Sequence, residues 1–265
     1  MRKLIAMTRE VSRALAQCEL THLSRSPINV DRAREQHAAY EEALRLAGCE
    51  IRRLPAADDL PDSVFIEDTA IVLDEIAIVT RPGALSRRGE CAAVAEALSR
   101  YRRVTWIQPP ATVDGGDVLV IERTIYVGQS TRTNPAAVDQ IAAAASPYGY
   151  RVEPVTVSGC LHLKSAVTAV GGNIILINRG WAPPSLAARY ETIDVHRDEA
   201  YGANAVAVAG RVIYPAAFPR TRERLEKHGL HVVSVDASEL AKAEGAVTCC
   251  SLIFAAGQLD QETTR

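Results

Sequence analysis

The stretch VLVIERTIYVG (residues 118–128) decides the fold, because it reads as two short apolar strands joined by a Glu122-Arg123 turn. The same pattern of two apolar halves around a central turn occurs four more times, over residues 69–79, 166–177, 205–215 and 251–259. The five turns are centred on residues 74–75, 122–123, 171–172, 210–211 and 256–257, so they lie 48, 49, 39 and 46 residues apart. A near-constant period of this kind predicts an internally repeated fold.

A helix and a third strand are expected after each hairpin. The helical patterns cover residues 31–47, 87–101, 135–145 and 221–228, and prolines suit the starts of the last two. The third strands are expected over residues 50–54, 104–108, 151–157, 192–195 and 232–235. The pair Pro183-Pro184 argues against a regular helix before Thr192.

The repeated unit is therefore strand–strand–helix–strand, and the N-terminal strand Lys3–Met7 is expected to complete the last unit. Each unit can bury its sheet and helix only against its neighbours, so five units close most simply into a ring. The sequence predicts one α/β domain over residues 1–265, a five-bladed pseudo-symmetric propeller.

Composition excludes several classes of protein. The 265 residues are 48% hydrophobic with a net charge of −2, which excludes a disordered chain and gives no general attraction to nucleic acid or membrane. No apolar run approaches the ~20 residues of a membrane span, and Arg9 and Glu10 interrupt any signal-peptide core. The six cysteines form no disulfide framework. We expect a cytoplasmic protein with free thiols, a monomer or homodimer without nucleic-acid or membrane partners.

Chemically active residues precede the hairpins. In a radial repeat, equivalent positions point to one pole, so Glu67, Asp68, Asp114, His162 and Cys249 should surround one opening. Cysteine, histidine and carboxylate together make an activated thiol nucleophile. Taken singly, the cysteine would more often be a core thiol and the histidine a structural residue.

Two neighbouring positions complete this interpretation. If residues 249 and 250 lie in a strand, their side chains point to opposite faces, so Cys250 should pack in the core. Phe65 suggests a partly apolar wall beside Glu67 and Asp68.

Five motifs in order, SRR (86–88), DGGD (114–117), STRTN (130–134), LHLKS (161–165) and TCCS (248–251), resemble those of the dimethylarginine dimethylaminohydrolase family. This family belongs to the penteins, five-bladed α/β propellers that modify guanidinium groups. The resemblance implies a nucleophilic Cys249, a catalytic His162 and an orienting acid at Asp114. It further implies that Glu67 and Asp68, with Asp62 nearby, bind the guanidinium of the substrate. Arg87 and Arg132 are implied to bind the substrate carboxylate. A lid over residues 13–20 is implied to contact the substrate through Leu20.

The implied reaction converts asymmetric dimethylarginine or monomethylarginine and water to citrulline and dimethylamine or methylamine, through a covalent thiouronium on Cys249. A guanidinium carbon is a poor electrophile, which suits a thiolate rather than a hydroxyl as nucleophile. No cofactor or metal is expected. Zinc at Cys249 and His162 would be an inhibitory ion, since the paired spacings of a structural zinc site are absent.

Three alternatives remain open at this point. An arginine deiminase-like or amidinotransferase-like pentein would use the same cysteine, histidine and acid, although such chains usually carry insertions. A non-catalytic five-bladed binding module would have no use for these three residues in register. The preference among arginine, monomethylarginine and dimethylarginine also stays open.

Overall fold

The computed structural model describes residues 3–257, which contain five sheets of three strands each. In chain order, the first four sheets are β3 (Ala70–Val72), β4 (Ile76–Val79) and β5 (Arg103–Trp106); β6 (Val118–Ile121), β7 (Thr124–Gln129) and β8 (Arg151–Thr156); β9 (Val167–Gly171), β10 (Ile174–Ile177) and β11 (Glu191–Asp194); and β12 (Val206–Val208), β13 (Arg211–Pro215) and β14 (His231–Val235). The fifth consists of β15 (Leu252–Ala255), β1 (Leu4–Arg9) and β2 (Cys49–Leu54).

Every sheet has the same pairing. The first strand is antiparallel to the second, as where Val118 faces Val127, and the second is parallel to the third, as where Val127 faces Pro154. The crossover helices that join the second and third strands are α1 (Val30–Leu46), α2 (Cys91–Leu98), α3 (Pro135–Ala145), α5 (Pro184–Ala187) and α6 (Pro219–Lys227). α5 has only 4 residues, as the Pro183-Pro184 pair predicted.

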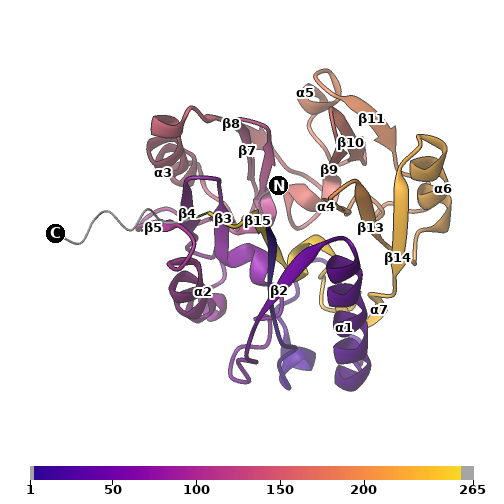
Figure 1. Ribbon diagram of the computed structural model, residues 1–265, viewed down its shortest axis with the longest axis horizontal. Coiled ribbons are helices and arrows are strands. Elements are labelled where there is room, and N and C mark those ends of the chain that lie inside the picture. Colours follow the sequence, from indigo (N-terminus) through magenta and orange to yellow (C-terminus); the bar gives the residue numbers. More distant parts are fainter. Residues whose placement is uncertain (1–2, 258–265) are drawn as a thin grey trace.

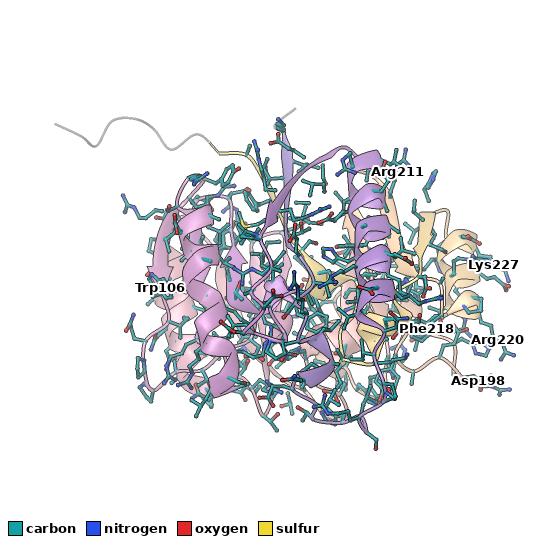
Figure 2. All side chains as sticks on the ribbon, turned by 90° about the horizontal axis from the view of Figure 1, so that it is seen from below. Trp106, Asp198, Arg211, Phe218, Arg220 and Lys227 are labelled. Atoms are coloured by element: carbon teal, nitrogen blue, oxygen red, sulfur yellow. The ribbon has the colours of Figure 1, made fainter. Side chains whose placement is uncertain are left out.

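The sheets surround a common centre and the crossover helices lie outside them (Figure 1). The first strands are innermost, since β9 contacts both β6 and β12, and β15 contacts β3. Figure 2 shows Trp106 of β5 at one rim, with Arg220 and Lys227 of α6 at the opposite rim. The arrangement is the predicted five-bladed α/β propeller.

The fifth hairpin was predicted wrongly. Within the described residues, β15 has no hairpin partner on its C-terminal side and instead pairs with β1, which places Leu4 opposite Ala255. Leu259, the expected end of that hairpin, lies outside the described residues. The predicted N-terminal strand is the second arm of this hairpin, so the pairing of β1 with β15 closes the ring.

The apolar core lies between adjacent blades. In one cluster, Ile141 of α3 packs with Ile125 of its own sheet and Ile78 of the preceding sheet. Burial of this kind fixes each blade against its neighbour, and with it the turns that precede the first strands. None of the helices between residues 3 and 257 is both long and apolar enough to cross a membrane.

Candidate active site

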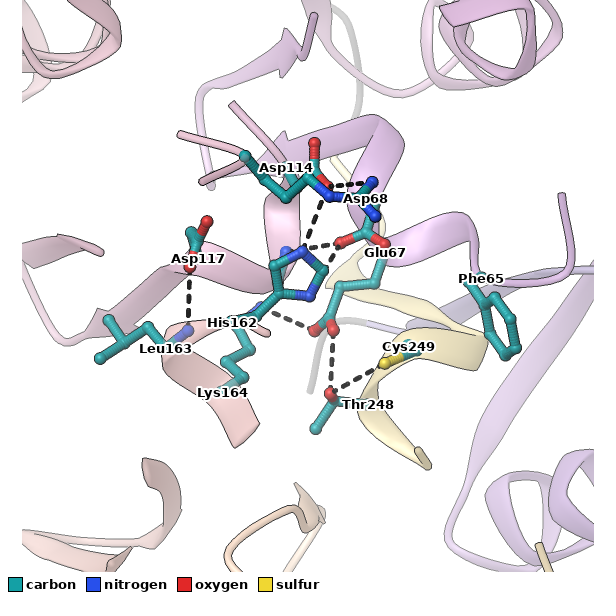
Figure 3. A network of polar contacts seen from close by, with 12 residues as sticks. Phe65, Glu67, Asp68, Asp114, Asp117, His162, Leu163, Lys164, Thr248 and Cys249 are labelled. Atoms are coloured by element: carbon teal, nitrogen blue, oxygen red, sulfur yellow. Dashed lines mark hydrogen bonds and ion pairs between the residues drawn. The ribbon is translucent and has the colours of Figure 1, made fainter. Parts of the chain in front are cut away.

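Short turns at one end of the ring supply the polar residues. The 3₁₀ turns Ile66–Thr69, Gly115–Asp117 and Thr248–Cys250 precede β3, β6 and β15, and the helical turn α4 (Leu163–Ala166) precedes β9. Residues from these four blades therefore converge, as Figure 3 shows. A narrow pocket at this point is lined by residues that include Asp68, His162 and Cys249.

The His162 imidazole lies between two carboxylates. Its Nε2 is 3.1 Å from Oδ2 of Asp114, and its Nδ1 is 3.9 Å from Oδ1 of Asp68. Burial opposes protonation, but the charges of Asp68, Asp117 and Asp114 and the hydrogen bond to Asp114 together raise the pKa of His162 to about 9. His162 is therefore a protonated acid at neutral pH.

Two glycines permit this close approach. A Cβ on Gly116 would lie 2.5 Å from Nδ1 of His162, and one on Gly115 would lie 2.0 Å from the carbonyl oxygen of Glu67. Gly83 N–H donates to Oδ1 of Asp114 at 2.9 Å, which orients the other oxygen toward the imidazole. Asp117 accepts hydrogen bonds from Ser130, Thr133 and the Leu163 N–H, in a structural role.

Asp68 is held by an arginine and a backbone amide. Nη1 of Arg87 donates to Oδ2 of Asp68 at 2.6 Å, and Gly116 N–H donates to Oδ1 at 2.8 Å. Burial opposes ionisation of Asp68, but His162 and Arg87 lower its pKa to about 2. Asp68 is therefore a buried anion that faces the pocket.

Arg87 is buried in this network as well as lining the pocket. Its Nε and Nη2 contact the carboxylate of Glu90 at 3.0 and 2.9 Å, and Nη2 also donates to the Phe65 carbonyl. Sequence analysis expected Arg87 to hold a substrate carboxylate. Most of its donors are engaged in these contacts, which makes support of Asp68 its evident role.

The Cys249 thiol lines the pocket, and Cys249 is the one cysteine among the six that is only partly buried. Burial of the sulfur, followed by the negative charges of Glu67 and Asp68, raises its pKa to about 12. The sulfur is therefore a neutral thiol until a positive charge enters the pocket.

Cys250 packs in the core, as expected, with 1% of its surface exposed. The reason differs from the prediction, because both cysteines lie in the 3₁₀ turn Thr248–Cys250 and not in a strand. The turn directs Cys249 to the pocket and Cys250 toward helix α1.

Glu67 already has partners in the described chain. Its Oε1 accepts from Nζ of Lys164 at 2.6 Å, and its Oε2 accepts from Oγ1 of Thr248 at 2.8 Å (Figure 3). Asn204 donates in turn to Thr248 Oγ1 at 2.9 Å. Sequence analysis assigned no role to Lys164, Thr248 or Asn204, since nothing in the spacing pairs them with an acid up to 181 residues away.

The N-terminal segment closes the outer end of the pocket. Asp62 Oδ2 accepts from the Glu19 N–H at 3.0 Å, and Arg132 Nη2 donates to Thr21 Oγ1 at 2.9 Å. Phe65, Asp62, Glu19 and Arg132 all line the pocket. Leu20 is half-buried against an apolar cluster that contains Phe65, and it is not one of the lining residues. Its predicted substrate contact remains a prediction.

The side chains placed to share a metal ion differ from the Cys249 and His162 pair considered for an inhibitory zinc ion. Within residues 3–257, the histidine, cysteine and acidic side chains close enough to share an ion are Asp68, Asp114 and His162. Cys249 does not belong to this group, and protonated His162 offers no lone pair on either ring nitrogen.

Comparisons with known proteins agree with this geometry. Residues 17–254 match the family described as N,N-dimethylarginine dimethylhydrolase, eukaryotic. The N(G),N(G)-dimethylarginine dimethylaminohydrolase of Streptomyces coelicolor is 45% identical over 253 residues, covering 93% of this chain and 95% of the relative. A structure of the Pseudomonas aeruginosa enzyme, a cysteine-to-serine variant complexed with citrulline, is similar with a TM-score of 0.91 and 35% identity, covering 96% of this chain and 100% of that one.

Proposed function

Because this chain belongs to the dimethylarginine dimethylaminohydrolase family, we propose that it hydrolyses asymmetric dimethylarginine and monomethylarginine to citrulline and dimethylamine or methylamine. The observation that carries the proposal is the convergence of Cys249, His162 and Asp114 from three blades on one acid-lined pocket. A binding module would need neither a protonated histidine nor an accessible thiol at that point.

Binding of the substrate cation starts the reaction. Asp68 lines the pocket and presents a carboxylate to the guanidinium. Glu67 is not one of the lining residues, so it can reach the guanidinium only when it exchanges its Lys164 or Thr248 contact. The guanidinium charge offsets the acids that keep Cys249 protonated, so the thiol pKa falls when substrate binds. The same acids fix the guanidinium carbon near the sulfur, and positioning of this kind lowers the barrier by several kcal/mol.

The chemical steps use one thiol, one imidazole and one water. The Cys249 thiolate attacks the guanidinium carbon, and the bond from that carbon to the methylated nitrogen breaks as His162 gives a proton to the departing amine. The product on sulfur is a thiouronium. His162, now neutral, removes a proton from water, whose oxygen attacks the same carbon, and the sulfur leaves as citrulline forms. Asp114 orients His162 through its 3.1 Å contact and stabilises the imidazolium.

Arg132 is suited to the amino-acid end of the substrate. It lines the outer part of the pocket with Glu19 and Asp62, and arginine binds carboxylates through two parallel hydrogen bonds. Arg87 would contribute only by releasing part of its hold on Asp68 and Glu90. Phe65 provides an apolar wall.

Substitution of the nucleophile tests the proposal. Cys249→Ser should fold normally and lose citrulline production, whereas Cys250→Ala, which changes a thiol outside the pocket, should retain it. Assays with arginine, monomethylarginine and asymmetric dimethylarginine separate the alternatives. Release of ammonia from arginine in preference to dimethylamine would indicate a deiminase, and normal turnover by Cys249→Ser would eliminate the proposed nucleophile.

We further infer that the reaction needs no metal or organic cofactor and takes place in the cytoplasm. The thiol, imidazole and carboxylates supply nucleophile, acid and base, and a nucleophilic thiol persists in a reducing compartment. Activity that survives dialysis against a chelator would support the first point. Loss of activity that added zinc restores would contradict it.

A further inference from the structure

The cover segment, residues 19–25, lies across the outer end of the Cys249 pocket. Glu19 contributes to the pocket lining, and its carboxylate accepts a hydrogen bond from Ser86 Oγ at 2.6 Å. Two further contacts, Glu19 N–H to Asp62 and Arg132 to Thr21, involve pocket groups that the proposed substrate would require. These contacts must therefore weaken when a ligand binds.

One further contact holds the cover segment without using a group that the proposed substrate would require. The Glu244 carboxylate accepts hydrogen bonds from three successive backbone amides, those of Thr21 at 3.0 Å, His22 at 2.6 Å and Leu23 at 2.5 Å. Successive backbone N–H groups make a concave anion site, and hydrogen bonds to a charged acceptor are stronger than those between neutral groups. The contact spans up to 223 residues of sequence, so it belongs to the assembled fold.

Glu244 itself stands in an unusual conformation. Its φ of 58° lies in the left-handed region, which residues other than glycine rarely adopt. It also lines the pocket, and it lies on the same connection as Cys249, between α7 (Ser238–Ala241) and the Thr248–Cys250 turn. A strained position at the edge of a site persists where surrounding contacts hold it, and three amides do so here.

We propose that Glu244 is a positioning residue that holds the cover segment closed over the pocket and joins it to the loop that carries Cys249. It controls how often the pocket opens to solvent. The effect on access is independent of the proposed reaction, whereas the effect on substrate turnover rests on the proposed function.

Alkylation of Cys249 measures access directly. The variants are Glu244→Ala, Glu244→Gln, which keeps an acceptor oxygen without the charge, and the control Glu96→Ala, which changes an exposed glutamate of α2. Iodoacetamide should modify Cys249 in the native protein, since the other five cysteines are buried, and mass spectrometry locates the label. We expect Glu244→Ala to be labelled about tenfold faster than wild type, the factor for losing hydrogen bonds to a charged group, with Glu244→Gln between them.

Hydrogen exchange separates this role from a general loss of stability. The amides of residues 21–23 should exchange faster in Glu244→Ala while core strands such as β7 keep their protection. Faster exchange throughout Glu244→Ala would instead mark a structural residue. In that case labelling and exchange in Glu244→Gln, which keeps the shape of the side chain, test whether the carboxylate holds the cover segment closed. Equal labelling and equal exchange in Glu244→Gln, Glu244→Ala and Glu96→Ala would overturn the proposal.

Kinetics test the part that depends on the proposed function. In Glu244→Ala the KM for asymmetric dimethylarginine should rise severalfold more than kcat changes, because the open segment releases bound substrate before the chemical step. A fall in kcat with unchanged KM would contradict the assignment. If wild-type protein shows no hydrolysis, the proposed function fails, and the labelling experiment still tests Glu244.

Discussion

At the residue scale, the carboxylates in and around the pocket oppose ionisation of the Cys249 thiol until a cationic substrate binds. Asp68 helps to hold His162 protonated, with a pKa of about 9, and together with Glu67 it contributes to the raised pKa of Cys249, about 12. The thiol in such a pocket reacts more slowly with neutral molecules than with cations. The pocket gains a nucleophile when a cation compensates Glu67 and Asp68.

Two alkylating agents of similar size should reveal this selectivity. Chloroacetamidine is a cation and chloroacetamide is neutral, so the cation should modify Cys249 at least about tenfold faster, the factor that one pKa unit of thiol activation supplies. Rates with a small free thiol correct for intrinsic reactivity. Neutral and cationic reagents with the same corrected rate would show that ligand charge does not activate Cys249.

The pH dependence of turnover should report His162. Because the acid form is needed to protonate the departing amine, kcat should decline as pH rises through the pKa of about 9. Asp114→Asn removes a charge that raises this pKa, so the alkaline limb should move to lower pH and kcat should fall about 10²-fold. Asp139→Asn, an exposed change on α3, is the control. An unmoved alkaline limb would argue that His162 does not set it.

The chemical residues could be predicted, and most of their partners could not. Cys249, His162 and Asp114 occupy equivalent places in the repeat, so periodicity alone brings them to one pole. Lys164 lies within the LHLKS motif (161–165), but its contact with Glu67 depends on the directions of side chains from two blades. The contact of Glu244 with three amides carries no periodic signal at all.

At the element scale, the Gly115–Asp117 turn controls the site through its shape. Gly116→Ala would place a Cβ 2.5 Å from Nδ1 of His162 and 2.9 Å from Oδ1 of Asp68. We expect kcat to fall about 10²-fold, since displacement of a catalytic group by about 1 Å has an effect of this size. Gly210→Ala is the contrast, because its φ is 77° and open space surrounds it. It should cost about 1–2 kcal/mol of stability without changing kcat. Equal kcat in both variants would show that the imidazole tolerates the shift.

The turns between the first and second strands were predictable, because acidic and glycine residues separate two apolar strands at a regular period. The 3₁₀ turns before the first strands were not, since short turns lack a hydrophobic period of their own. The pair at 249 and 250 shows the consequence. Its expected strand is a turn, although the opposite directions of the two thiols were predicted.

At the scale of the whole molecule, the ring has no covalent closure. Four blades take their hairpins from continuous sequence, and the fifth pairs β15 near the C-terminus with β1 near the N-terminus. Sequence periodicity predicted five units and the use of the N-terminal strand. It placed a turn at residues 256–257, because an apolar strand followed by alanine and glycine resembles the start of another hairpin.

Because β1 closes the ring, we expect a destabilising substitution in β1 to lower the stability of distant blades as well. Ile5 is 2% exposed in an apolar cluster that contains Phe254 and Ile66, so Ile5→Ala should lower the free energy of unfolding by about 2–5 kcal/mol. Trp106 on β5 and Trp181 after β10 report on two other sheets. In urea, their fluorescence and far-UV circular dichroism should shift to the same lower midpoint, because each blade is stable only against its neighbours.

Leu46→Ala, at a position 66% exposed, is the control and should change the free energy of unfolding by less than about 0.5 kcal/mol. A fluorescence midpoint that stays in place while the circular dichroism transition splits would mean that the fifth blade opens alone, and that closure by the chain ends does not hold the ring together.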